Sequence, residues 1–486
     1  MKLAALLDDP RLASEPSLLD REIAGLTSDS RKVAPGYVFA ALPGSRADGR
    51  AYIADALARG AAAVLADADT AGPGPFVRDR NPRRRLALMA ARFYQRQPAT
   101  VVAVTGTSGK TSTASYCQQI WNRLGLKSAS IGTLGIRGAG VDRYGALTTP
   151  DPVALHADLA ALAGAGVTHL AMEASSHGLD QFRLDGVTLS AAGFTNLARD
   201  HLDYHATIES YRAAKTRLFG ELLPGGAGAV LNADSPEFPA LRTVCAQRGL
   251  VLLPYGRATP TAGLQLLDVE PQPGRLLLSF RYRDTAYRAD LALAGTFQAW
   301  NALCALGLVL AAGAPPGEAA AALGALVGAP GRMELAARHP NGAPIYVDYA
   351  HKPDALEAVL TEVRPQVKGK LAVVFGCGGD RDRGKRPIMG EIAARLADRV
   401  YVTDDNPRSE PPAAIRKEIL AAARGAIEIG DRAEAIATAV AALAPGDVLV
   451  IAGKGHEQGQ IVGDKTLPFD DIAVARKAAA ALGGRA

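Results

Sequence analysis

The sequence has few cysteines, few aromatic residues and no long apolar segment. Its four cysteines are far apart and form no C-x-x-C pair, which argues against a zinc site and a disulfide scaffold; they are Cys117, Cys245, Cys304 and Cys377. No stretch approaches the roughly 18 uncharged apolar residues of a membrane helix. The opening MKLAALLDDP is cut off by two aspartates, too early for a secretory signal. We therefore expect a cytoplasmic protein with reduced thiols and no membrane insertion.

The sequence also has little excess of positive over negative charge. Fifty-four basic against 49 acidic side chains leave a formal charge of +5 on 486 residues, which does not predict a nucleic-acid partner. Hydrophobic residues make up 48% and charged residues 21% of the chain, which is typical of a globular protein. At about 150 residues per domain, the length favours about three domains.

Two breaks in the pattern divide the chain. Residues 1–97 mix short apolar runs with turns and end in a helical pattern over 85–94, before Gln97-Pro98. From residue 101 buried strands alternate with helices, as in a mostly parallel sheet covered on both faces. After Gly328-Ala329-Pro330-Gly331 this alternation restarts, with helices expected at 354–363, 387–397, 412–423 and 431–443. We predict an α/β protein of three domains. These are a small α/β N-terminal domain (1–97), a central phosphate-loop ATPase domain with a mostly parallel sheet (98–330) and a C-terminal Rossmann-like α/β domain (331–486).

A phosphate-binding loop is predicted at Thr105-Gly106-Thr107-Ser108-Gly109-Lys110-Thr111-Ser112, after the apolar strand 101–104. Glycines let backbone N–H groups surround phosphates, Lys110 can reach the β and γ oxygens, and the Thr111 hydroxyl suits Mg²⁺. Val104 stands where the full motif has its first glycine. On this ground alone, a glycine-rich turn with a chance Gly-Lys-Thr stays an alternative.

Further candidates follow the next strands. Glu173 ends an apolar strand, where open α/β sheets bind ligands and where a carboxylate suits Mg²⁺, although it can instead cap the next helix. The run 196–205 contains Asp200, His201 and Asp203, which suit metal binding or proton transfer but also a plain polar loop. Lys215 lies in an amphipathic helical pattern, and its spacing alone predicts a surface lysine.

Together these motifs resemble the Mur ligase family, the ATP-dependent amide-bond-forming enzymes of peptidoglycan assembly. The resemblance rests on TGTSGKTS, Glu173, DHLDYH, Lys215, Asn301 in TFQAWNAL and VDYAHKPDAL, and the family's shortened loop accounts for the missing glycine. The segments LTSDSRKV, LTTPD, MEASSHGLDQFR, GCGGDRDRGKRP, DDNPR and GKGHE are most similar to the branch that adds the third residue of the stem peptide.

That resemblance implies a set of small-molecule partners. The substrates are ATP, UDP-N-acetylmuramoyl-L-alanyl-D-glutamate (the UDP-MurNAc-dipeptide) and meso-diaminopimelate, joined through an acyl phosphate. The cofactors are Mg²⁺ and CO₂, the latter bound as a lysine carbamate. Neither a nucleic acid nor a second subunit is implied, so we expect a monomer.

The resemblance also implies roles for individual residues. Catalysis is assigned to Lys110, Lys215 and His201, and metal binding to Thr111, Glu173, His201 and Lys215 as the carbamate. ATP is assigned to Gly106, Thr107, Ser108, Gly109, Lys110, Thr111, Ser112, Asn301, Arg332, Asp348 and His351. The UDP-sugar-peptide is assigned to Ser28, Ser30, Ser45, Arg46, Ala47, Thr148, Thr149, Ser175, Gln181 and Arg183. Diaminopimelate is assigned to Arg381, Asp405, Asn406, Pro407, Arg408, Gly453 and Glu457.

Three positions depart from the family pattern, and three alternatives remain. Leu147 and Gln298 stand where asparagine is expected, and Lys352 where threonine is expected. The alternatives are another Mur ligase or a folylpolyglutamate synthetase, an ATP-gated binding module without turnover, and an NAD-binding oxidoreductase built on residues 373–379. The last segment lacks the third spaced glycine of the dinucleotide motif. Taken alone, Asp-Asn-Pro-Arg at 405–408 also suits a surface β-turn.

Overall fold

The computed structural model describes residues 1–44, 48–71, 74–145, 147–260, 263–272 and 274–484, with the side chains of residues 202 and 203 left aside. The sugar-binding candidates Ser45, Arg46 and Ala47 lie outside these residues. The chain forms two compact units. The first comprises Met1–Leu231, Ser235–Leu253 and Gly307–Ala314, and the second comprises Asn232–Asp234, Pro254–Leu306 and Pro315–Ala486. All four cysteines are buried, and no described helix is long and apolar enough to cross a membrane.

The first unit begins with a small parallel sheet. Its strands, in spatial order, are β1 (Gly25–Thr27), β2 (Tyr37–Ala40), β3 (Ala63–Asp67) and β4 (Phe76–Asp79). Alternate residues point to opposite faces of a strand, so Leu65 shares a core with α3 (Pro82–Tyr94), whereas Val64 shares one with α2 (Ile53–Ala58). Helix α3 starts three residues before the predicted 85, because the Asn81 side chain accepts a hydrogen bond from the Arg84 N–H and a proline follows it.

A larger sheet of the first unit has the order β11-β10-β5-β9-β6-β7-β8. The strands are β5 (Thr100–Thr105), β6 (Ser128–Gly132), β7 (Gly135–Gly138), β8 (Val141–Arg143), β9 (His169–Glu173), β10 (Ala191–Phe194) and β11 (Gly228–Asn232). The first five in the spatial order run parallel, and β7 and β8 add an antiparallel edge. Around them are α4 (Lys110–Arg123), α5 (Pro152–Gly164), α6 (Ser176–Asp180), α7 (Leu202–His205), α8 (Ile208–Arg217) and α9 (Phe238–Gln247). The predicted mostly parallel central sheet is confirmed.

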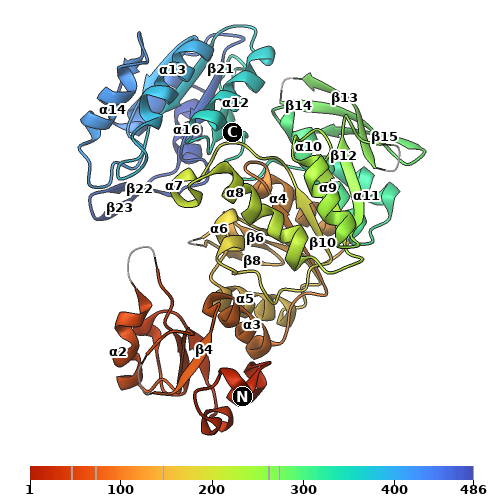
Figure 1. Cartoon of the computed structure of the whole chain (residues 1–486). Helices are drawn as coiled ribbons and strands as arrows, with labels where there is room; N and C mark the ends of the chain where they lie inside the picture. Colours follow the sequence, from red (N-terminus) through yellow and green to blue (C-terminus); the bar gives the residue numbers. More distant parts are fainter. Residues whose placement is uncertain (45–47, 72–73, 146, 261–262, 273, 485–486) are drawn as a thin grey trace. The chain divides into compact units, whose positions relative to one another are not determined.

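The second unit contains an antiparallel meander that the sequence did not lead us to expect. Strands β13 (Leu264–Gln272), β14 (Arg275–Tyr282) and β15 (Thr285–Leu291) pair in succession, as Figure 1 shows in green. β13 also pairs in parallel with the end of β12 (Val251–Gly256). On β14 the residues Leu276, Leu278 and Phe280 are buried at every second position, the pattern of a half-buried strand. Helices α10 (Phe297–Ala311) and α11 (Pro316–Ala322) follow.

A six-stranded sheet of order β16-β17-β21-β18-β19-β20 forms the rest of the second unit. Its strands are β16 (Glu334–Arg338), β17 (Pro344–Asp348), β18 (Leu371–Phe375), β19 (Arg399–Val402), β20 (Ile427–Glu428) and β21 (Val448–Ala452). Only the β16–β17 pairing is antiparallel. The helices are α12 (Pro353–Val363), α13 (Lys385–Leu396), α14 (Pro412–Leu420), α15 (Arg432–Ala441) and α16 (Asp471–Ala481). The four predicted helices correspond to α12 to α15, and the Rossmann-like α/β class is confirmed.

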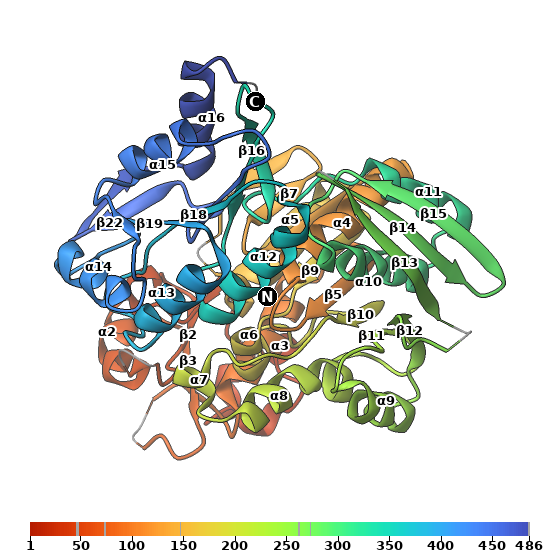
Figure 2. The ribbon, with the colours of Figure 1, turned by 90° about the horizontal axis from the view of Figure 1, so that it is seen from above.

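Two separate cores cover the two faces of this sheet. Val373 and Phe375 of β18 pack in one core with Leu356 and Met389, from α12 and α13. Val374 packs in the other core with residues of α15 and α16. Figure 2 shows α15 and α16 on one side of β18 and β19, with α12 and α13 on the other. Burial on both faces explains why these strands read as continuous apolar runs.

A buried ion pair connects three elements of the second core. Arg432 begins α15 and Asp471 begins α16, and both side chains are fully enclosed. The guanidinium donates to both carboxylate oxygens at 2.7 Å and to the Ala452 carbonyl of β21 at 3.0 Å. Two opposite charges without solvent are stable only as a pair.

Arg432→Met is expected to lower the free energy of unfolding by about 3–5 kcal/mol, because it leaves the Asp471 carboxylate buried without its partner. Arg476→Met is the control, since Arg476 is half exposed and 3.7 Å from Glu334, and it should cost about 1 kcal/mol or less. Urea unfolding measures both. If the double variant Arg432→Met/Asp471→Leu is no more stable than Arg432→Met alone, the unpaired carboxylate is not the cause.

Candidate active site

The predicted phosphate loop lies between β5 and α4. Strand β5 ends at Thr105, Gly109 precedes the helix with φ of +87°, and α4 begins at Lys110. The Lys110 ammonium donates to the carbonyls of Gly106 at 2.9 Å and Thr107 at 3.0 Å, so it lies over the loop. The N-terminus of α4 therefore meets the loop where anionic phosphate is favoured.

Residues after β10 hold the loop in shape. The Asn196 side-chain oxygen accepts a hydrogen bond from the Ser108 N–H at 2.9 Å, and the Thr195 hydroxyl donates to the Ser108 carbonyl at 2.6 Å. A β-carbon on Gly106 would lie 1.9 Å from the Thr195 oxygen, so only glycine fits there. Sequence analysis places Asn196 at the start of a polar run and assigns it no role. Its position directly after a strand is the feature that could have identified it.

Glu173 ends β9, as predicted, and its side chain is 2% exposed. One carboxylate oxygen accepts from the Thr133 N–H at 2.8 Å and the other from the Thr133 hydroxyl at 3.2 Å. A β-carbon on Gly132 would lie 2.1 Å from the carboxylate, so the strand beside it needs glycine. The helix-capping alternative for Glu173 is wrong, because Ser175 caps α6 by accepting from the Gly178 N–H at 3.0 Å.

Four of the residues assigned to the sugar-peptide gather around Glu173. The Thr149 hydroxyl donates to the Glu173 carbonyl at 2.9 Å and lies 3.0 Å from the Ser175 hydroxyl. Arg183 donates to the Thr149 carbonyl at 2.8 Å and to the Gln181 side-chain oxygen at 2.7 Å.

The rest of the sugar-peptide set is more scattered. The Thr148 hydroxyl lies 3.0 Å from that of Thr133, which itself bonds Glu173. Leu147, where asparagine is expected, is 46% exposed. Ser28 and Ser30 follow β1 in the small sheet, a different sheet from the one that carries Glu173.

Lys215 is not the surface lysine that its spacing predicted. Its side chain is 2% exposed, its ammonium donates to the Gly106 carbonyl at 2.7 Å, and it lies 4.3 Å from the centre of the Tyr211 ring. The Tyr211 hydroxyl in turn lies 3.1 Å from the Thr107 hydroxyl. Helix α8 thus places an amine against the phosphate loop, although Lys215 and Gly106 are about a hundred residues apart in the sequence. The periodicity of one helix cannot reveal such a contact.

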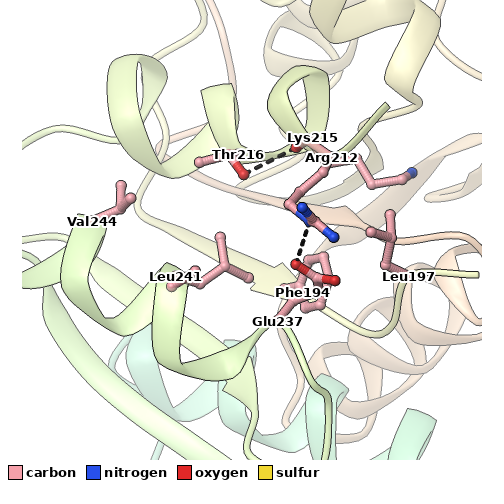
Figure 3. Close-up of a pocket in the computed structure, with 9 residues that line it drawn as sticks. Phe194, Leu197, Arg212, Lys215, Thr216, Glu237, Leu241 and Val244 are labelled. Carbon is pink, nitrogen blue, oxygen red and sulfur yellow. Dashed lines mark hydrogen bonds and ion pairs between the residues drawn. The ribbon is translucent and has the colours of Figure 1, made fainter. Parts of the chain in front are cut away.

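A mostly apolar cavity lies behind Lys215, lined by Phe194, Leu197, Leu241 and Val244 among others. Figure 3 shows the Lys215 amine pointing away from the Leu241 and Val244 side of this cavity. Between them the Arg212 guanidinium lies 2.7 Å from the Glu237 carboxylate. The amine of Lys215 is therefore directed to the loop and not to the cavity.

His201 has the left-handed backbone conformation, with φ of +53°. Its Nε2 lies 3.4 Å from an Asp200 oxygen, and its ring centre is 4.7 Å from that of His177. A non-glycine residue in this conformation is strained and is found often at functional sites. No group of three or more His, Cys, Asp and Glu side chains in the described residues is arranged as a ready metal cage. Mg²⁺ does not need one, since it keeps several waters and takes one or two protein oxygens.

In the second unit, Arg332, Asp348 and His351 lie around the end of β17. The Asp348 carboxylate accepts from the N–H groups of Met333 at 2.7 Å and Ala350 at 2.8 Å, and burial raises its pKa. Arg332 lies 4.4 Å from the centre of the Tyr349 ring. Burial lowers the pKa of His351 to about 3, so its ring is neutral near pH 7.

Asn301 lies apart from these residues in sequence, on α10. Its amide donates to the Gln298 side-chain oxygen at 3.0 Å. The departure at Gln298 therefore preserves an amide that holds Asn301.

The segment 405–408 is not a surface turn, because Asp405, Asn406 and Pro407 are buried. The Arg408 guanidinium donates through Nη1 to the Gly379 carbonyl at 2.9 Å and the Asn406 carbonyl at 3.3 Å. Arg408 has φ of +52° and pairs with Val462 of the hairpin β22 (Gly459–Val462) and β23 (Lys465–Pro468). Burial, and after it the charge of Arg381, lowers the pKa of Arg408.

Both ends of the Asn406 side-chain amide make hydrogen bonds within the second unit. Its side-chain oxygen accepts from the Lys454 ammonium and the Ile461 N–H, both at 2.9 Å, and its amide donates to Glu457 at 2.9 Å. Burial and the nearby Asp405 raise the pKa of Glu457. The sequence-based predictions assign no role to Lys454. It lies in the GKGHE motif, from which only Gly453 and Glu457 are assigned to diaminopimelate.

A phosphate loop on a mostly parallel sheet, followed by a second α/β sheet, defines a phosphate-loop nucleotide-binding α/β protein. Family models match three segments: 22–94 (Mur ligase family, catalytic domain), 104–309 (Mur ligase middle domain) and 331–455 (Mur ligase, glutamate ligase domain). The chain belongs to the Mur ligase family. This membership removes the oxidoreductase alternative, which was built on the glycines at 376–379. Those glycines instead pack against the Asp405 segment, and a β-carbon on Gly379 would lie 1.9 Å from the Pro407 carbonyl.

Close relatives cover nearly the whole chain. A protein of Agrobacterium fabrum named UDP-N-acetylmuramoyl-L-alanyl-D-glutamate--2,6-diaminopimelate ligase is 56% identical over 95% of this chain and 94% of its own. One of the same name from Mesorhizobium japonicum is 57% identical over 93% and 94%. A solved structure with that name is 33% identical, covers 99% of both chains and has a TM-score of 0.73.

The neutral state of His351 makes stability depend on pH. Below the ordinary pKa of 6.5 the unfolded chain takes up a proton on this ring, while the folded chain does so only near pH 3. Stability contributed by the neutral ring is therefore complete above pH 6.5 and is lost as the pH falls. Between pH 7 and pH 5, wild type should lose about 1–2 kcal/mol more than His351→Asn in urea unfolding. Equal losses in the two proteins would contradict a buried, neutral ring.

Proposed function

We propose that this chain is an ATP-dependent ligase that joins meso-diaminopimelate to the D-glutamate of UDP-N-acetylmuramoyl-L-alanyl-D-glutamate in peptidoglycan synthesis. The observation that carries the proposal is the cluster of Glu173, Thr149, Ser175 and Arg183 at the end of the strand beside the phosphate-loop strand. The names of the full-length relatives support the same substrates. We expect the enzyme to act as a cytoplasmic monomer.

The chemistry requires activation of a carboxylate, which is a poor electrophile. Transfer of the γ-phosphate of ATP to the D-glutamate carboxylate gives an acyl phosphate, and the incoming amine attacks its carbonyl and displaces phosphate. Catalysis of such steps is mostly positioning and neutralisation of charge. Lys110 and the loop N–H groups take the phosphates, and the roles of Asn301, Arg332, Asp348 and His351 at ATP are proposed from the family resemblance alone.

Mg²⁺ suits the oxygen donors on the loop side of the sheet. Thr111, Glu173 and His201 would hold it, and when bound it neutralises phosphate charge. The buried Glu173 carboxylate, fixed by Thr133, is a hard oxygen donor in a rigid position.

A carbamate on Lys215 is the finer part of the proposal. The ammonium first loses a proton, and the uncharged amine then adds to CO₂ and releases a second proton, so that a cation becomes an anion. Support comes from the position of the amine, enclosed by protein and 2.7 Å from a carbonyl of the phosphate loop. An anion there would help to hold Mg²⁺, whereas an ammonium would repel it.

Recognition of meso-diaminopimelate is assigned to Arg408 and Glu457. Among the residues that the structure describes, Nε and Nη2 of Arg408 make no hydrogen bond, because both of its hydrogen bonds come from Nη1. Such a pair of adjacent donors matches the distal carboxylate that lysine lacks. Glu457 accepts the distal ammonium, and Arg381 and the Gly453 backbone complete the set.

The decisive experiment measures ADP release with the UDP-MurNAc-dipeptide and a panel of diamino acids. We expect turnover with meso-diaminopimelate and roughly 100-fold lower kcat/KM with L-lysine, which corresponds to about 2.7 kcal/mol. Lys110→Ala should abolish ADP formation, and Arg408→Ala should lose the preference for meso-diaminopimelate while ATP still binds. Another Mur ligase or a folylpolyglutamate synthetase would reject this amino acid, and a binding module would release no ADP.

Lys215→Ala is expected to lose most activity, because it removes the group proposed to carry the anion. Acetate or formate should restore part of the rate by supplying a carboxylate in the vacated space. Carbamate on wild type can be observed directly by ¹³C NMR with labelled bicarbonate. Full activity of the alanine variant would refute the role, and Lys127→Ala, of an exposed lysine in the same unit, is the control.

A further inference from the structure

Lys454 is a fully buried lysine directly after β21. Its ammonium donates to the Asn406 side-chain oxygen at 2.9 Å and to the Gly459 carbonyl at 2.8 Å. It also lies 3.4 Å from an oxygen of Asp405 and 3.7 Å from one of Glu457. Four oxygens from two separate segments of the second unit, residues 405–406 and 457–459, therefore surround one charge.

This lysine determines which way the Asn406 amide points. A lysine ammonium and a backbone N–H can only donate, so the Asn406 atom that faces Lys454 and Ile461 must be the oxygen. The NH₂ group is then turned to Glu457, to which it donates at 2.9 Å. Without Lys454, one of the two donors that fix this orientation is gone.

The charge of Lys454 also acts on two neighbouring carboxylates. Asp405 and Glu457 both lie close to its ammonium, and the charge of Asp405 makes ionisation of Glu457 less favourable. The groups that face Glu457 are Asp405, Arg408, Lys454 and Asn406, and Tyr349 and Arg432 also interact with its charge. Lys454 and Arg408 oppose the rise in the pKa of Glu457 that burial and Asp405 produce.

A purely structural role explains this arrangement poorly. Replacing a whole buried ion cluster, the lysine together with its carboxylates, by apolar side chains of similar size is often neutral or stabilising, so packing alone does not require charged groups here. The hairpin that begins at Gly459 is already attached to the Arg408 segment by backbone hydrogen bonds, Arg408 N–H to Ile461 at 3.1 Å and Gly463 N–H to Arg408 at 2.8 Å. What the ammonium adds is charge and a fixed amide next to Glu457.

We propose that Lys454 is a positioning residue for amino-acid specificity, which orients Asn406 and keeps Glu457 ionised to receive the distal ammonium of the diamino acid. The inference rests on the proposed function, and it adds a residue that does not itself touch the substrate. It implies that Lys454 affects the amino acid and neither ATP nor the nucleotide sugar.

The test compares Lys454→Met and Lys454→Arg with wild type in the ADP-release assay. In Lys454→Met the KM for meso-diaminopimelate should rise about 10- to 100-fold, the effect of losing hydrogen bonds to charged groups, with the KM of ATP and of the nucleotide sugar unchanged. Lys454→Arg, which keeps the charge, should recover part of the loss. Lys465→Met, of an exposed lysine on β23, should behave as wild type.

The pH profile separates this role from a loss of packing. Removal of the positive charge raises the pKa of Glu457, so the acid limb of kcat/KM for meso-diaminopimelate should move to higher pH in Lys454→Met and not in Lys454→Arg. A packing defect would lower the rate at every pH without moving the limb.

Asn406→Asp is the second variant, and it keeps the proposal testable if Lys454→Met does not fold. It retains a partner for Lys454 but offers no N–H to Glu457, so it should raise the KM for meso-diaminopimelate and move the acid limb in the same direction. An unmoved acid limb or an unchanged KM in the folded variant overturns the role of Lys454. If wild type uses no diamino acid at all, the proposed function fails and this inference fails with it.

Discussion

Two lysine ammonium groups donate to one carbonyl oxygen, that of Gly106, and this convergence determines the character of the phosphate loop. Lys110 reaches it from the first turn of α4, and Lys215 reaches it from α8. Like charges so near to one another, beside the N-terminus of a helix, favour anions in the loop. ATP phosphates satisfy this demand, and conversion of one ammonium into a carbamate would reduce the repulsion that remains. The nucleotide phosphates and the carbamate proposed on Lys215 would thus both answer the same electrostatic constraint.

Close backbone approach lets the polar groups around this loop keep their positions. Gly106 leaves room for the Thr195 hydroxyl, and Gly132 leaves room for the Glu173 carboxylate. A side chain at either position would displace a group that is fixed by two or more hydrogen bonds. The site is therefore built by strands that come close together, and its donors and acceptors are arranged before any ligand binds, which lowers the cost of ordering them on binding.

Sequence patterns predicted the α/β class, the strand–loop–helix order at Lys110 and Glu173 at a strand end, since each depends on residues close together in the chain. Sequence patterns did not predict contacts between segments that lie far apart in the chain. Lys215 looked like a surface residue because periodicity reports the face of a helix but not what covers it. The meander β13–β15 was not predicted, because a search for continuous apolar runs does not detect half-buried strands. The left-handed backbone conformations of His201 and Arg408 have no signature in the sequence.

The C-terminal pocket shows how burial alters the role of a residue that sequence had singled out. The family resemblance assigns Asn406 to diaminopimelate, yet its oxygen accepts from Lys454 and Ile461, and its amide already donates to Glu457. Discrimination between a carboxylate and its absence must then depend chiefly on Nε and Nη2 of Arg408, which make no hydrogen bond within the described part of the chain. Because the carbonyls of Gly379 and Asn406 fix one end of that guanidinium, its remaining edge is presented in one orientation. A planar fork held in this way favours a ligand with a carboxylate and leaves the donors of a partly buried guanidinium unused by one without it. Selectivity therefore arises from the rigidity of the protein around Arg408 as much as from its charge.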